Sequence, residues 1–340
     1  LKSEEEMLSI TINGHGPIGS IVVDAYANGN VRGLVFNDPP KSLFEPVTYT
    51  LSLGGKRIRP ALTLMAYNIY KEDVASALDV AMGLEVFHNF TLLHDDLMDE
   101  ADMRRGQPTV HKVWDANTAI LSGDAMLIAA YRLVAKADRV HLKPALDLFT
   151  QTALEICGGQ QYDMEFEKRD DVAEEEYIEM IRLKTAVLLA CALKMGAILA
   201  DAPAEDAEHL YHFGIAIGLA FQLQDDLLDV YGDPKTFGKN IGGDILCDKK
   251  TFLLINAFKR SNEQQKEVLK RWIGAASVDP QAKIAAVTDI YNQLHLKQLS
   301  EEKIEAYFTE AMSHLDALNV EPVKLAALKE ISHLLMNRKS

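Results

Sequence analysis

Apolar residues that recur at three- and four-residue spacing are the strongest constraint on the fold of this chain. From about Lys41 to the C-terminus the pattern covers the segments Ala61–Tyr70, Val74–Asp99, Ala119–Ala137, Ala145–Phe166, Tyr177–Leu199, Glu205–Val230, Thr251–Lys259, Ile284–Leu315 and Val323–Leu335. Such spacing places apolar side chains on one face of an α-helix. Breakers such as Gly54-Gly55 separate the segments, and alternation with a period of two is rare. The sequence therefore predicts an all-α fold, a single large antiparallel helical bundle whose functional site lies in a central cavity.

The composition excludes several classes of protein. The 340 residues are 48% hydrophobic and carry a formal net charge of -15, with no dominant basic face for nucleic acid. The three cysteines, Cys157, Cys191 and Cys247, are too widely spaced for a disulfide framework or a zinc knuckle. No apolar run reaches the roughly 18 residues of a membrane span, and no secretory signal is recognised. We therefore expect a cytoplasmic protein with no nucleic-acid partner and no membrane span.

Two copies of the pattern Asp-Asp-x-x-Asp indicate a metal site. The first carboxylate motif is Asp95, Asp96 and Asp99, and the second carboxylate motif is Asp225, Asp226 and Asp229. On a helix, the first and last aspartates share one face, about 6 Å apart along the axis. A single copy is typical of a solvated acidic face, but two copies flanked by apolar residues favour cation binding. Hard carboxylate oxygens without Cys or His favour Mg²⁺ over Zn²⁺, so the pair predicts a metal-bridged polyphosphate.

Basic residues accompany both motifs. Arg104-Arg105-Gly106 follows the first motif, and Lys239 and Lys249 follow the second. Upstream, Gly54-Gly55-Lys56-Arg57-Ile58-Arg59-Pro60 places a glycine turn and three cations where a helix is expected to begin, which favours phosphate binding. Each of these features, taken alone, is also typical of a charged surface. Beside two carboxylate motifs, they predict a site that holds anionic groups from several directions.

In this order, the motifs resemble those of the trans-isoprenyl diphosphate synthases, over about residues 41–340. The resemblance implies head-to-tail condensation of isopentenyl diphosphate with an allylic diphosphate (dimethylallyl, geranyl or farnesyl), which gives a short-chain all-trans prenyl diphosphate and pyrophosphate. It also implies a prenyltransferase that acts as a homodimer with three Mg²⁺ ions per site. A first ionisation of the allylic C–O bond, stabilised by cations, would be followed by capture of the allylic cation and loss of a proton to pyrophosphate.

The same resemblance assigns roles to individual residues. Mg²⁺ would be bound by Asp95, Asp99 and Asp225, with Asp96 and Asp229 as indirect partners. The allylic diphosphate would be held by Arg104, Lys184, Lys239 and Lys249. Isopentenyl diphosphate would be held by Lys56, Arg59, His88 and Arg105. Beside the reacting carbons, catalytic contacts would come from Lys184, Thr185 and Gln222.

Product length is expected to depend on the residues just before the first carboxylate motif. Phe90 is bulky and stands five residues before Asp95, whereas Thr91 is small and stands one turn before it. By resemblance, an aromatic residue here shortens the product, so we expect geranylgeranyl (C20) diphosphate, with farnesyl (C15) diphosphate next. Ordinary core packing is the other interpretation of Phe90.

The first 40 residues differ from the rest. Alternation within Ile10–Leu34 around Asn28-Gly29 predicts a β-hairpin. The segment resembles the N-terminal hairpin of the redox-regulated heat-shock chaperones, but that family's zinc-binding cysteines have no counterpart here. We expect a peripheral hairpin or arm without a carried-over function, and an insertion, a fusion or a sequence artefact remain alternatives.

Two other functions remain to be weighed. A terpene cyclase usually replaces the second aspartate motif and lacks the pocket for isopentenyl diphosphate, whereas this chain keeps both motifs and Lys56 and Arg59. A non-catalytic regulatory subunit usually lacks a motif, and none is lost here. Both alternatives are therefore disfavoured.

Overall fold

The computed structural model describes residues 36, 39–232, 241–275 and 278–336. In this part of the chain nearly all regular structure is helical, and the only strands form one short hairpin of β1 (Met103–Arg104) and β2 (Gln107–Pro108). The prediction of an all-α fold is confirmed. The β-hairpin predicted within Ile10–Leu34 lies outside the described residues. No helix of the described ranges is both long and apolar enough to cross a membrane.

The chain divides into two compact units. Unit 1 comprises Leu1–Thr150, Cys191–Glu208 and Asn319–Leu328, and unit 2 comprises Gln151–Ala190, His209–Leu318 and Lys329–Ser340. Helices α7 (Arg139–Phe166), α9 (Val187–Leu199), α10 (Ala204–Tyr231) and α17 (Ala326–Met336) each contain residues of both units.

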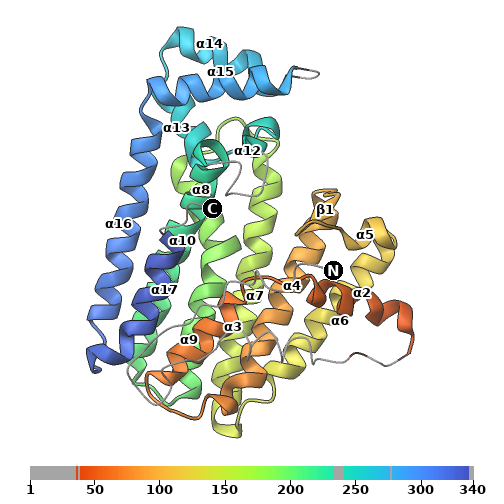
Figure 1. Ribbon diagram of the computed structural model, residues 1–340, viewed down its shortest axis with the longest axis vertical. Coiled ribbons are helices and arrows are strands. Elements are labelled where there is room, and N and C mark those ends of the chain that lie inside the picture. Colours follow the sequence, from red (N-terminus) through yellow and green to blue (C-terminus); the bar gives the residue numbers. More distant parts are fainter. Residues whose placement is uncertain (1–35, 37–38, 233–240, 276–277, 337–340) are drawn as a thin grey trace, which may run out of the picture. The chain divides into compact units, whose positions relative to one another are not determined.

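Unit 1 is organised around helix α4 (Leu78–Met98), which packs along α6 (Ala116–Val134) and against α3 (Ile58–Asn68) (Figure 1). Helix α2 (Lys41–Ser52) also packs on α6. The shorter elements are η1 (Val74–Ala77), the β1–β2 hairpin, α5 (Val110–Val113) and η3 (Pro322–Leu325). Large fully buried side chains of this unit include Leu62, Leu84, Phe87, Met126 and Phe149.

Unit 2 contains α8 (Glu174–Ile181), η2 (Arg182–Ala186), α12 (Gly243–Leu246), α13 (Phe252–Arg260), α14 (Glu263–Trp272), α15 (Pro280–Gln293) and α16 (Leu296–Asp316). One buried cluster includes Tyr177, Leu223 and Phe252, and a second includes Leu269 and Tyr291. Helices α14 and α15 lie side by side (Figure 1). The second cluster therefore anchors this helix pair to the end of α10 and to α13.

Capping residues explain where several helices of unit 2 begin. Thr251 accepts a hydrogen bond from Leu254 N at 3.4 Å at the start of α13, and Asn262 accepts one from Gln265 N at 2.9 Å at the start of α14. Asp279 caps α15 in the same way, directly before a proline at the first helical position. Side chains of this kind satisfy N–H groups that have no partner inside the helix.

Two expected helices are interrupted. Ile284–Leu315 was predicted as one segment, but α15 ends at Gln293 and α16 begins at Leu296, because His295 adopts a left-handed φ of 54°. Tyr177–Leu199 contains η2, one turn of π-helix between α8 and α9. Neither interruption is marked by glycine or proline in the sequence.

The π turn η2 lies against two helices that approach it through glycine. A Cβ on Gly159 of α7 would lie 2.4 Å from Lys184 N, and one on Gly218 of α10 would lie 2.6 Å from Ala186 Cα. Cβ atoms do not approach a backbone this closely, so glycine is required at both positions. By contrast, a Cβ on Gly158 would meet none of the described atoms within 4 Å.

Gly159→Ala is expected to lower the free energy of unfolding by about 1–3 kcal/mol, the usual cost of overpacking. Gly158→Ala is the matched control, because alanine in an open helical position should be neutral or stabilise by about 0.5–1 kcal/mol. Urea denaturation of the two variants measures the difference. Equal stability of the two would contradict the close approach of α7 to η2.

Candidate active site

Helix α4 presents the outer aspartates of the first carboxylate motif. Asp99 caps the helix, and its N–H donates to Asp95 O at 2.9 Å. Helical geometry therefore extends to Asp99 and places it one turn beyond Asp95. Asp95 is partly exposed and Asp99 is exposed, so both carboxylates can be reached by a ligand.

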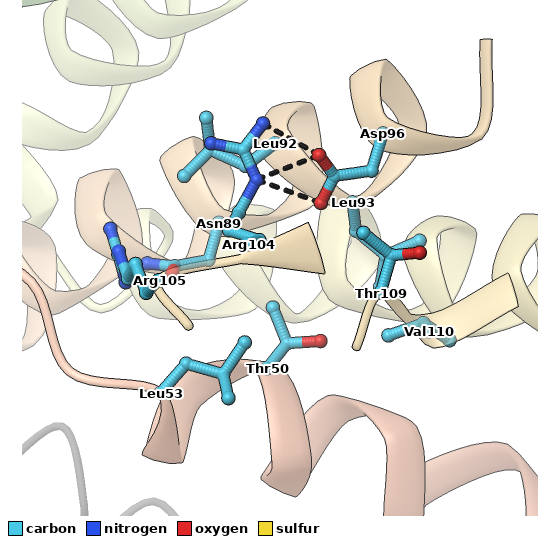
Figure 2. A pocket seen from close by; sticks show the side chains of 10 residues that line it. All are labelled: Thr50, Leu53, Asn89, Leu92, Leu93, Asp96, Arg104, Arg105, Thr109 and Val110. Carbon is cyan, nitrogen blue, oxygen red and sulfur yellow. Dashed lines mark hydrogen bonds and ion pairs between the residues drawn. The ribbon is translucent and has the colours of Figure 1, made fainter. Parts of the chain in front are cut away.

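The middle aspartate, Asp96, is buried and bound to Arg104 (Figure 2). Arg104 Nε lies 2.8 and 2.7 Å from the two carboxylate oxygens, and Nη2 lies 2.6 Å from Asp96 Oδ1 and 3.8 Å from Asp95 Oδ2. Burial raises the pKa of Asp96, although Arg104 opposes this. Burial also opposes the charge of Arg104, but its bonds to Asp96 raise the pKa of the guanidinium overall. The short contacts mark a charged pair that holds the motif in place.

The β1–β2 hairpin positions the second arginine of the pair. Its turn residues, Arg105 and Gly106, have φ values of 51° and 74°, as a two-residue turn with two left-handed positions requires. Arg105 Nη1 donates to Gly54 O. A Cβ on Gly55 would lie 2.7 Å from Arg105 Nη2, so the glycine turn makes room for this guanidinium. A small pocket here is lined by residues from α2, α4, α5 and the hairpin, among them Arg105 (Figure 2).

Charged groups lie buried behind the glycine turn. Arg57 is 3% exposed, and its Nη1 donates to Glu85 Oε1 at 2.6 Å. Burial lowers the pKa of Arg59 to about 10. This value is still well above neutral pH, so the guanidinium stays charged. Burial is the main cause that holds the pKa of His88 well below its usual value, and the positive charges of the neighbouring arginines lower it further. The imidazole is therefore neutral. Lys56 is exposed at the same turn.

In unit 2, the second carboxylate motif repeats the arrangement of the first. Asp225 and Asp229 lie one turn apart on α10 and are partly exposed. Asp226 is 4% exposed and accepts hydrogen bonds from Tyr177 Oη and, at 3.1 Å, from Gln222 Nε2. Burial raises the pKa of Asp226 to about 6. In both motifs, the buried middle carboxylate is thus held by a donor from outside the motif.

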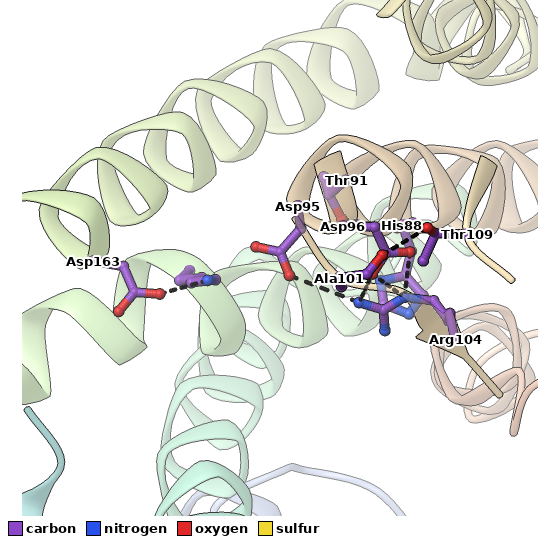
Figure 3. Close-up of polar contacts among 9 residues, drawn as sticks. His88, Thr91, Asp95, Asp96, Ala101, Arg104, Thr109 and Asp163 are labelled. Carbon is purple, nitrogen blue, oxygen red and sulfur yellow. Dashed lines mark hydrogen bonds and ion pairs between the residues drawn. The ribbon is translucent and has the colours of Figure 1, made fainter. Parts of the chain in front are cut away.

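The π turn η2 presents two polar side chains in succession. Lys184 Nζ donates to Asp163 Oδ2 at 2.6 Å (Figure 3). Thr185 Oγ1 donates to Gln222 Oε1 at 3.2 Å, and Gln222 in turn bonds Asp226. Single π turns are frequent at functional sites because they re-aim neighbouring side chains. The structure thus joins Thr185 and Gln222 to the second carboxylate motif.

Lys249 is held near the same motif. Its Nζ lies 3.6 Å from Asp244 Oδ1, and Asp244 N donates to Asp229 Oδ2 at 3.0 Å. Burial lowers the pKa of Lys249, but the carboxylates of Asp226 and Asp244 raise it overall, so the ammonium stays charged. Lys239 lies outside the described residues.

Phe90 is fixed by aromatic neighbours on its own helix. Its ring centroid lies 5.5 Å from that of Phe87 and 4.8 Å from that of His94. Thr91 Oγ1 donates to His88 O at 2.8 Å, so this hydroxyl is satisfied within α4. Phe90 is partly exposed, and its ring can therefore border a pocket as well as pack.

The outer aspartates fit Mg²⁺ by their chemistry. Across the described ranges, no three His, Cys, Asp or Glu side chains come close enough to hold a metal ion by themselves. Mg²⁺ commonly takes one or two carboxylates and completes its shell with water and substrate phosphate oxygens. The accessible outer aspartates can supply these carboxylates, and the phosphate oxygens of a bound substrate would supply other ligands of the Mg²⁺ ion.

The family model described as Polyprenyl synthetase matches residues 40–292. The chain belongs to the polyprenyl synthetase family. It is 36% identical to the geranylgeranyl diphosphate synthase of Methanosarcina mazei over 299 residues, which cover 87% of this chain and 90% of that protein. It is 41% identical to the geranylfarnesyl diphosphate synthase of Natronomonas pharaonis over 236 residues, 64% of this chain and 69% of that protein. A crystal structure of geranylgeranyl pyrophosphate synthase superimposes with a TM-score of 0.89 at 44% identity, covering 94% of this chain and 98% of the other.

A second match concerns the start of this polyprenyl synthetase. Residues 1–64 match the model described as Hsp33 protein. The two matches overlap over residues 40–64, where the described structure consists of α2 and the beginning of α3. The overlapping residues therefore belong to the helical fold.

Several residues that support the site were missed in the sequence. Glu85 binds Arg57 of the glycine turn, Asp163 binds the predicted site residue Lys184, and Tyr177 binds the buried Asp226. An indirect role for Asp226 could have been predicted by comparison with Asp96, since both stand at the second position of their motif. Tyr177 and Asp163 carry no local signal, because their partners are far away in the sequence.

Asp226→Asn is expected to stabilise the protein more at pH 7.5 than at pH 4.5, relative to wild type. The folded-state pKa of Asp226, about 6, exceeds its ordinary value of 3.8. The stability that the protonated Asp226 side chain contributes to the folded state is therefore complete below about pH 4 and is lost as the pH rises through 6. Between pH 4.5 and pH 7.5, the free energy of unfolding of Asp226→Asn relative to wild type should increase by on the order of 1–3 kcal/mol.

Chemical denaturation at both pH values measures this difference. Asp289→Asn, at an exposed position on α15, serves as the control and should show no comparable pH dependence. If the stability difference between wild type and Asp226→Asn did not change with pH, burial would not raise the pKa of the Asp226 carboxylate in the folded protein.

Proposed function

We propose that this chain catalyses the Mg²⁺-dependent head-to-tail condensation of isopentenyl diphosphate with an allylic diphosphate, releasing pyrophosphate. The observation that carries the proposal is shared by both carboxylate motifs: the outer aspartates remain reachable while the middle one is buried on a fixed donor. Family membership and the names of the relatives support the same reaction. Bound Mg²⁺ would neutralise charge on the departing pyrophosphate.

The basic residues would hold the allylic diphosphate and stabilise the developing charge. Arg104, Lys184 and Lys249 each lie beside a carboxylate, which restricts their side chains before the substrate binds. We include Lys239 in this group from the sequence alone. Mg²⁺ ligation is assigned to Asp95, Asp99 and Asp225, with Asp96 and Asp229 as indirect partners, and the number of ions stays a prediction.

Isopentenyl diphosphate would bind at the glycine turn, through Lys56, Arg59, His88 and Arg105. Among the described residues, Arg59 Nε is buried without a hydrogen-bond partner. A buried donor that lacks an acceptor is costly, and an anionic ligand would supply one. Thr185 and Gln222 would lie beside the reacting carbons, and the apolar helix surfaces would exclude water from the cation.

We further propose that the catalytic part begins near residue 41 and acts as a homodimer. The family match begins at residue 40. Helix α6 exposes Ile120, Leu121 and Ile128 at 44%, 59% and 62%, an apolar surface suited to a second copy of the chain. Sedimentation of the purified protein as a monomer would contradict this assembly.

Product analysis tests the proposed reaction. We expect wild-type protein incubated with isopentenyl diphosphate, Mg²⁺ and dimethylallyl, geranyl or farnesyl diphosphate to give elongated prenyl alcohols after phosphatase treatment. Asp95→Ala should reduce turnover by at least about a thousandfold, because a metal ligand is lost. Asp289→Ala, at an exposed carboxylate on α15, is the matched control and should retain activity. No elongated product from wild type would refute the proposal.

Phe90→Ala tests the proposed control of product length. We favour a C20 product, with C15 next, because a rigid aromatic ring below the first carboxylate motif would stop chain growth. Removing the ring should shift the product by at least one five-carbon unit. Phe258→Ala, a partly buried aromatic residue of α13, should leave the product unchanged. An unaltered product from Phe90→Ala would leave Phe90 with a packing role only.

A further inference from the structure

Lys249 depends on a very short helix for its position. It follows α12, a four-residue helix (Gly243–Leu246), and comes directly after Asp248, whose φ of 54° is left-handed. Lys249 N donates to Asp244 O at 3.0 Å, which closes the turn. One helical turn is not stable by itself, because nucleation outweighs so few hydrogen bonds. External contacts must therefore hold α12 in shape.

One end of α12 is bound to the second carboxylate motif. Gly242 N donates to Asp229 O at 2.7 Å, and Asp244 N donates to Asp229 Oδ2 at 3.0 Å. The start of α12 is thus linked to Asp229 by two hydrogen bonds, one to its backbone carbonyl and one to its carboxylate. A displacement of α12 would move Asp229 and Lys249 together.

The other end is held by a buried lysine of α15. Lys283 is 2% exposed, and its Nζ donates to Asp248 Oδ1 at 2.6 Å and to Leu246 O at 3.2 Å. The second oxygen of Asp248 accepts from Gly274 N at 2.9 Å. A buried ammonium is costly unless it is paired and hydrogen-bonded, so these contacts strongly favour one arrangement of α12.

The residue after Lys283 packs close to the start of α12. A Cβ on Gly242, whose φ is 84°, would lie 2.7 Å from Ile284 Cδ1. Helix α15 therefore contacts α12 at both ends, through Ile284 at its start and Lys283 at its end. Neither residue belongs to a carboxylate motif or to the basic residues selected from the sequence.

We propose that Lys283 is a positioning residue that clamps α12 through Asp248 and so sets Lys249 and Asp229 for the allylic diphosphate. This inference rests on the proposed function, since it assumes that Lys249 binds that substrate. If Lys283 only stabilised the packing of α15, its loss would affect both substrates alike. If it positions Lys249, the allylic diphosphate alone should bind more weakly.

Three variants test the clamp. Lys283→Met removes the charge at similar length, Lys283→Arg keeps it, and Asp248→Asn removes the partner at a less buried position. Lys270→Met is the matched control, because Lys270 forms an exposed ion pair with Glu267 on α14 of the same unit. All are assayed below the melting temperature of the least stable variant.

Two measurements are made on each variant. Hydrogen exchange should become at least about tenfold faster over residues 242–251 in Lys283→Met and Asp248→Asn, but not over α14. KM for the allylic diphosphate should rise about tenfold, while KM for isopentenyl diphosphate stays unchanged. Lys283→Arg keeps the charge, so its exchange over residues 242–251 and its KM for the allylic diphosphate should stay close to the wild-type values. Lys270→Met should match wild type in both measurements.

The outcomes separate the two proposals. Unchanged exchange over residues 242–251 overturns the clamp, and so does an equal rise in both KM values. If Lys283→Met does not fold, Asp248→Asn gives the same two measurements. A wild-type protein without prenyl product would refute the proposed function, and the exchange experiment would still decide whether Lys283 holds α12.

Discussion

The candidate site depends on a buried negative charge in each carboxylate motif. Asp96 is held by Arg104, and Asp226 by Tyr177 and Gln222. A carboxylate that loses its water must be given hydrogen bonds in return, and few orientations of the helix provide them. The middle aspartate therefore adds to the apolar packing that fixes the rotation of the helix about its axis. The outer aspartates of the motif then face the solvent side as a consequence.

Acidic residues also determine how the basic groups are presented. Arg57 is bound by Glu85, Lys184 by Asp163, and Lys249 lies near Asp244. Each pair restrains a long side chain that would otherwise sample many rotamers. The excess of acidic over basic residues in the sequence is thus compatible with binding of diphosphates, because many carboxylates support cations instead of repelling the ligand.

The helical fold could be predicted from the sequence because apolar spacing is a local property. The positions of α4 and α10, and the carboxylate motifs they carry, follow from that spacing and from the spacing of the aspartates. The π turn at Lys184 and the break at His295 could not be predicted, because neither glycine nor proline marks them in the sequence, and the π turn packs against the distant helices α7 and α10. The pairing of Arg57 with the buried Glu85 could not be predicted either, because it joins two segments that only the fold brings together.

The supporting residues show the limit of reading motifs alone. Tyr177 and Asp163 have no recognisable spacing to their partners, since each contact joins segments that only the fold brings together. Burial was the missing information: the pattern Asp-Asp-x-x-Asp treats three carboxylates alike, but the structure separates one inner residue from two outer ones in each motif.

The π turn η2 has a consequence for how this segment can change during evolution. Such a turn holds one residue more than the α-helical turn it replaces, so it amounts to an insertion that the helix has absorbed. Without it, every residue that follows would be rotated by about 100°. The four successive residues after the turn, Val187, Leu188, Leu189 and Ala190, are all buried, so every side of this helix is packed and a rotation would disturb those contacts. Segment length is therefore constrained here in addition to residue identity, because a one-residue deletion would rotate the whole of the helix that follows.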